Sequence, residues 1–111
     1  FVGEALDYVN THMTENISVR DIADALNVSQ SYLSHAFKKS TGYGLWNYVI
    51  SKRLVYAQKL LLEGISVTEA CYESGFRDYA HFIKSFTKTF GCSPKQYGKE
   101  EPSSYMVKLY L

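Results

Sequence analysis

The sequence predicts an all-α fold of about seven helices, with two helix-turn-helix subdomains joined by a long linker helix. Two observations carry this prediction. Apolar residues recur at helical spacing along most of the chain, and no segment alternates convincingly as a strand. The chain also contains an internal repeat, and both copies carry helix start and stop signals at matching positions. The 111 residues are 46% apolar and 21% charged, which suits one globular domain with a core of its own.

The repeat has an offset of 48 residues that becomes 49 in its second half. The tripeptide Ile-Ser-Val at residues 17–19 recurs at residues 65–67. After one extra residue near Arg77, Gly42 matches Gly91. Two copies of one small module are the simplest interpretation of this pattern.

Seven helices are expected in order along the chain. They are an amphipathic leading helix over residues 3–14, a short helix over 19–26, a longer helix from the N-cap Ser29 to Gly42, a linker helix over about 45–63, a short helix over 67–74, a longer helix from the N-cap Asp78 to Gly91, and a last short helix over 94–99.

The capping residues justify the starts and ends of these helices. Ser18 and Ser66 each precede a carboxylate by three residues, which predicts a capping box in both copies. Asn27 and Gly75 follow the short helices and tolerate a left-handed exit. Ser93, followed by proline, predicts the start of the last helix.

These elements define the expected domain organisation. One domain covers residues 1–99, with the first helix-turn-helix at about 18–42 and the second at about 66–91. Residues 100–111 receive no assignment. The chain begins Phe1-Val2 without an initiator Met, so we interpret it as part of a longer protein.

Charge is distributed in blocks although the net charge is only +1. Residues 29–63 and residues 76–99 each carry a net charge of +4, whereas residues 1–28 carry −4 and residues 64–75 carry −2. Two basic blocks favour an anionic partner contacted at two places. Solvated helix faces of random sign are the alternative.

The two longer helices have outward faces that suit a DNA groove. A helical wheel places Leu33, Ala36, Phe37 and Ser40 inward on the first, and Phe82, Phe86 and Phe90 inward on the second. It places Ser31, Ser34, His35 and Lys38 outward on the first, and Ala80, Ile83, Lys84 and Thr87 outward on the second. Beyond the N-cap Asp78 these faces contain no carboxylate, as close approach to the major groove requires.

Other classes of function find little support in the residues. His12, His35 and His81 are scattered over separate helices, so we expect no metal site, and no cofactor motif is present. No catalytic motif is present, which predicts that the chain is not an enzyme. Cys71 matches a small apolar position of the first copy and is expected to be a buried structural thiol. No apolar stretch is long enough for a membrane span. A helical protein-interaction module remains the alternative to DNA binding.

Residues 75–97 contain the patterns Gly-Phe, Phe-x3-Phe-x3-Phe-Gly and Pro-x2-Tyr, and the first copy and linker add Phe37, Gly42, Arg53 and Ala57. Over residues 4–97 the chain therefore resembles the DNA-binding domain of AraC/XylS-type bacterial transcription regulators. The resemblance implies sequence-specific binding of double-stranded DNA as the output domain of a longer cytoplasmic regulator. It also implies promoter or operator DNA and RNA polymerase as partners, a monomeric isolated domain, and a dimeric parent protein.

The resemblance also implies positions for the DNA contacts. The base-facing residues would be Ser31, Ser34, His35, Ala80, His81 and Lys84. From charge and helix starts we expect phosphate contacts at Ser29, Lys38, Lys39, Arg53, Asp78, Lys88 and Lys95, with those of Ser29 and Asp78 made by nearby backbone amides. Several base-facing side chains are short, so modest intrinsic specificity is expected.

Overall fold

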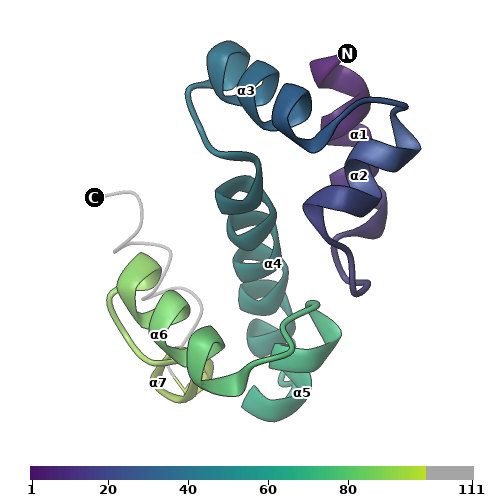
Figure 1. Cartoon of the computed structure of the whole chain (residues 1–111). Helices are drawn as coiled ribbons and strands as arrows, with labels where there is room; N and C mark the ends of the chain where they lie inside the picture. The colour runs from purple at the N-terminus through teal and green to yellow at the C-terminus, as the bar shows by residue number, and fades with distance from the viewer. Residues whose placement is uncertain (100–111) are drawn as a thin grey trace. The chain divides into compact units, whose positions relative to one another are not determined.

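The computed structural model describes residues 1–99, and over these residues it contains seven α-helices and no strand (Figure 1). The helices are α1 (Val2–His12), α2 (Val19–Ala25), α3 (Gln30–Thr41), α4 (Leu45–Leu62), α5 (Val67–Glu73), α6 (Tyr79–Phe90) and α7 (Pro94–Lys99). The predicted all-α fold is confirmed, and each predicted helix end lies within two residues of the observed one.

The chain divides into two compact units, Phe1–Arg53 and Leu54–Leu111. The first contains α1, α2, α3 and the start of α4, and the second contains the rest of α4 with α5, α6 and α7. Each unit therefore holds one short helix followed by one longer helix, as the repeat predicts. The unassigned segment 100–111 lies outside the described residues.

The core of the first unit forms where α1, α2 and α3 pack against one another. Its buried residues are Ala5, Val9, Ile17, Ile22, Ala23, Leu33, Phe37, Leu45 and Val49. Burial of one large apolar side chain contributes roughly 1.5–3 kcal/mol, so these residues hold α3 firmly by its inner face.

The second unit is built around aromatic side chains where α5, α6 and α7 meet. Phe86 is fully buried, and its ring centroid lies 4.6 Å from that of Phe90 and 5.6 Å from that of Tyr97. Phe82 lies between Phe86 and Phe76, with centroid distances of 5.8 and 5.1 Å. Contacts of this kind fix the inner face of α6.

The capping box is complete in the first copy only. The amide of Asp21 donates to Ser18 Oγ at 3.2 Å, and the amide of Ser18 donates to Asp21 Oδ2 at 2.8 Å. In the second copy Ser66 Oγ accepts the amide of Glu69 at 3.2 Å, but the carboxylate does not return a bond. The prediction of a second capping box is therefore wrong, because the exposed Glu69 side chain makes no return bond to the amide of Ser66.

The other terminal signals are confirmed. Asn27 has a φ of 58°, in the left-handed region, where the chain leaves α2 towards α3. Gly75 has a φ of 105° at the equivalent place after α5. Ser93 Oγ accepts the amide of Gln96 at the start of α7. The wheel was wrong for Ser40, which is exposed because it lies in the last turn of α3, beyond the core.

Candidate nucleic-acid interface

Helix α3 presents a polar outer face because its inner face is held by the core. Ser29 begins the helix, and its hydroxyl accepts the amide of Tyr32 at 3.1 Å. One turn later Leu33 and Phe37 are buried, which sets the rotation of the helix about its axis. The three predicted base-facing residues of this copy, Ser31, Ser34 and His35, are all exposed.

Helix α6 is built in the same way in the second unit. The Asp78 carboxylate accepts the amide of His81 at 3.1 Å, and Phe82 and Phe86 bury the inner face. The predicted base-facing residues of this copy, Ala80, His81 and Lys84, are exposed. The ring of His81 also meets Phe76 edge-on, with 5.9 Å between ring centroids, which restricts its orientation.

Both helices combine positive charge with an absence of acidic side chains. Neither Gln30–Thr41 nor Tyr79–Phe90 contains an aspartate or glutamate. The predicted phosphate-contacting lysines are exposed, and within residues 1–99 none of them takes part in a recorded ion pair; they are Lys38, Lys39, Lys88 and Lys95. Lysines without an internal counterion are available to an external anion.

The starts of the two helices differ in charge. The first amides of a helix lack intrahelical partners and attract anions. At α3 the cap is the neutral hydroxyl of Ser29, whereas at α6 the cap is the Asp78 carboxylate. A phosphate approaching the second start would therefore meet a negative charge that is absent from the first.

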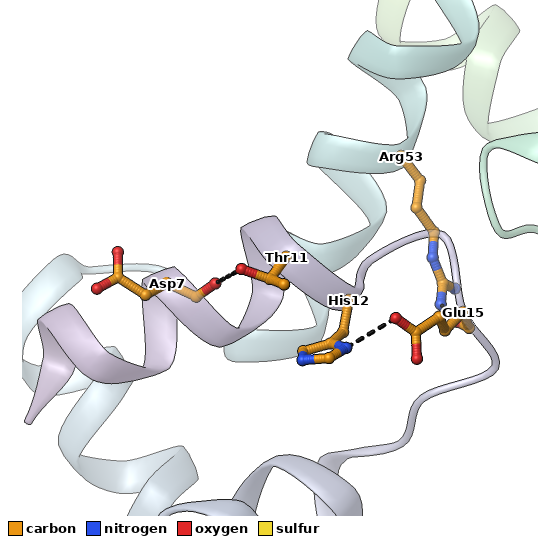
Figure 2. Close-up of polar contacts among 5 residues, drawn as sticks. All are labelled: Asp7, Thr11, His12, Glu15 and Arg53. Carbon is orange, nitrogen blue, oxygen red and sulfur yellow. Dashed lines mark hydrogen bonds and ion pairs between the residues drawn. The ribbon is translucent and has the colours of Figure 1, made fainter.

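Arg53 does not fit the phosphate contact expected for it. Its side chain is only 5% exposed, and its guanidinium donates to the carbonyl oxygens of Met13 and Glu15. Figure 2 shows the side chain reaching from α4 to the turn that holds Glu15. These internal hydrogen bonds use two of the donors that a phosphate contact would draw on, so Arg53 is placed differently from the exposed lysines.

The structure also identifies candidates that sequence reasoning did not assign to DNA. Gln30 and Tyr79 are the first residues of α3 and α6, and both are exposed. Gln30 carries an amide that can both donate to and accept from a base edge. The sequence could have indicated both residues, because each directly follows a predicted N-cap, Ser29 or Asp78. Ile83, which the wheel placed outward, is half-buried.

Groups that would carry other chemistry are dispersed or buried. No cluster of three metal-ligating side chains occurs within the part of the chain that the structure describes. Over the same residues, every helix is too short or too polar to cross a membrane. Cys71 is buried, as predicted, and burial, assisted by the nearby Asp78 charge, raises its pKa to about 11.

Comparisons with known proteins agree with this geometry. A family described as a helix-turn-helix domain matches residues 22–100. The Msm operon regulatory protein of Streptococcus mutans is 34% identical over 101 residues, which cover 90% of this chain and 36% of that protein. For the lactose operon transcription activator of Staphylococcus xylosus the identity is 31%, over 86% of this chain and 35% of that protein. The chain thus spans about a third of the length of these relatives.

Solved structures show the same fold. The DNA-binding domain of AdpA, in complex with a target DNA, superposes with a TM-score of 0.82 at 25% identity and covers 96% of this chain and 94% of that one. A probable AraC family transcriptional regulator from Rhodopseudomonas palustris gives a TM-score of 0.79 at 25% identity, covering 88% of this chain and 94% of that one.

Proposed function

This chain belongs to the AraC-type helix-turn-helix family of DNA-binding domains, and on that premise we propose that α3 and α6 enter successive major grooves of one duplex. Such grooves lie about 34 Å apart on one face of DNA. The internal repeat and the continuous helix α4 support this mode, because they supply two equivalent helices on one scaffold.

One observation carries the proposal most directly. In both α3 and α6 the outer face is exposed and free of carboxylates, and the lysines beside it form no ion pair with any residue of the described range 1–99. An ordinary solvated helix usually mixes acidic and basic side chains on its outer face. Small side chains such as Ser31 and Ala80 permit close approach of the backbone to base edges.

The contacts divide into two kinds. Base edges would be contacted by the exposed residues of the two helices, Ser31, Ser34, His35, Ala80, His81 and Lys84. Phosphates would be contacted by Lys38, Lys39, Lys88 and Lys95 and by the amides that follow Ser29 and Asp78. Four lysines that each neutralise one phosphate would give log Kd a slope of about 3.6 against log salt.

The role of the longer parent protein is part of the same proposal. The Msm operon and lactose operon relatives are regulators by name, and this chain matches only about a third of the length of each. We place this domain as the output domain of a bacterial cytoplasmic regulator that acts on RNA polymerase at a promoter. The isolated domain would be a monomer, and dimerisation would belong to the parent.

A footprint on DNA tests the proposed mode. A DNA site is first selected from a random duplex pool and then probed with hydroxyl radicals in the presence of the domain. The expected result is two protected segments on one face of the duplex, about 34 Å apart. Protection of a single half-turn, or of two opposite faces, would refute the two-groove mode. Binding that lacks a salt dependence would favour the protein-interaction alternative.

A further inference from the structure

One face of α4 continues the core of the first unit, and the last residue of this face within that unit is charged. Leu45, Val49 and Arg53 are four residues apart and therefore lie in a row along the helix. Leu45 and Val49 belong to the apolar core of that unit. Arg53 occupies the third place in the row, where a further apolar residue would be expected.

The guanidinium of Arg53 binds the turn between α1 and α2. Its Nε donates to the carbonyl oxygen of Met13 at 2.6 Å, and its Nη2 donates to the carbonyl oxygen of Glu15 at 3.0 Å. The ring of Trp46 lies 5.3 Å from the guanidinium carbon, in cation–π contact. Two carbonyls that follow the end of α1 thereby gain a charged donor from a residue about 40 positions away.

The turn that Arg53 binds is itself connected to the core. The amide of Ile17 donates to the carbonyl oxygen of Glu15 at 2.8 Å, so this oxygen accepts from both Ile17 and Arg53. Ile17 is buried in the first unit. On the outer side, Figure 2 shows the Glu15 carboxylate paired with His12, at 2.7 Å. Arg53 therefore attaches α4 to a turn that is already ordered.

We infer that Arg53 is a positioning residue for DNA binding, which anchors the third turn of α4 to the first helix-turn-helix unit. Without it, the contacts of α4 with that unit would be those of its first two turns, where Leu45 and Val49 are buried and Tyr48 packs against the core. Because α4 continues to Leu62, the direction in which it leaves the first unit helps to determine the spacing between α3 and α6 on DNA. The inference rests on the proposed two-groove mode.

A substitution at Arg53 has a matched control in α2. Arg53→Met keeps a long apolar stem and removes both donors. Arg20→Met makes the same chemical change at an exposed residue, whose recorded partner is Asp24 at 3.9 Å. Arg53→Lys keeps the positive charge but replaces the planar guanidinium by a single ammonium group, so it serves as a milder variant if Arg53→Met does not fold.

Amide hydrogen exchange on the free protein tests the anchoring itself. In Arg53→Met the amide of Ile17 should exchange at least about tenfold faster, since the turn can then open locally, while amides of α6 keep their rates. Arg53→Lys should give a smaller change in the same place, and Arg20→Met should give none. An unchanged rate at Ile17 in both Arg53 variants would overturn the inference.

The spacing of two half-sites on DNA tests the positioning role. Wild-type protein should lose about tenfold in affinity when one base pair is inserted between the half-sites of its selected site. Arg53→Met should bind the unaltered site more weakly and lose only about twofold on insertion, with the salt slope of the wild type retained.

The outcomes separate the two claims. If Arg53→Met keeps the full dependence on spacing, or if its salt slope falls by about one unit as for a lost phosphate contact, the positioning role is wrong. If the wild type shows no dependence on spacing, the two-groove mode fails together with the role in spacing. In that event hydrogen exchange still decides whether Arg53 anchors the turn.

Discussion

The caps of α3 and α6 differ by one charge, and exchanging them tests whether phosphates lie at the helix starts. The hydroxyl of Ser29 and the carboxylate of Asp78 each accept a backbone amide at 3.1 Å. Serine and aspartate are comparably good N-caps. Asp78→Ser and Ser29→Asp therefore move a charge between the two starts while each helix keeps its cap.

The expected effect follows from the distance between the cap and a bound phosphate. A carboxylate about 6 Å from a phosphate is repelled by about 0.7 kcal/mol in water, and by more where solvent is excluded. Asp78→Ser should therefore tighten DNA binding by at least about threefold, and Ser29→Asp should weaken it by a similar factor. The free energy of unfolding should change by no more than about 1 kcal/mol, because an acid at a helix start contributes roughly 0.3–1 kcal/mol.

Fluorescence anisotropy with the selected duplex measures these affinities, and urea unfolding measures stability. The double exchange is the matched control, because it keeps the net charge at +1 and should bind with nearly wild-type affinity. Unchanged or weaker binding by Asp78→Ser, with stability retained, would refute the reasoning, since the start of α6 would then not face a phosphate.

Three further predictions follow from the positions of individual side chains. Lys88→Ala should weaken binding to all sequences alike and lower the salt slope by about one unit, and a changed base preference with an unchanged slope would contradict its assignment to phosphate. Lys84→Ala should relax the base preference at one or two base pairs and weaken binding to the selected site by roughly 1–3 kcal/mol, and His35→Ala should relax the preference at other base pairs. Site selection from a random duplex pool measures both effects. Unchanged preferences would show that neither residue contacts bases. The Cys71 thiol, with its pKa raised from 9.0 to about 11, should be alkylated at pH 8 far more slowly in the native protein than in urea. The unfolded thiol ionises at a lower pH than the folded one, so the free energy of unfolding should also fall as the pH rises from about 9 towards 11. Urea titrations at several pH values would measure this decrease, and Cys71→Ala should lack the part that the thiol causes.

The sequence alone was sufficient for the helices and their order. Ser29, Asp78 and Asn27 mark helix boundaries through bonds and backbone angles that lie within a few residues, so their effect can be predicted locally. The inward positions of Phe37 and Phe86 follow from helical periodicity, which is also local. The outer faces of α3 and α6 are the complement of these buried residues and were predicted in the same way, except that Ile83 is half-buried.

The tertiary structure decided the features that depend on distant partners. In the sequence, Arg53 is one basic residue in a basic block; its spacing from Leu45 and Val49 puts it on their helix face, but nothing in the sequence identifies the partners of its guanidinium. Its carbonyl partners at Met13 and Glu15 lie 40 and 38 residues away, and only the folded first unit brings them within hydrogen-bond distance. The guanidinium is satisfied by backbone oxygens, which every residue carries and no sequence pattern marks. For that physical reason the burial of Arg53 and its backbone partners could not be predicted from the sequence.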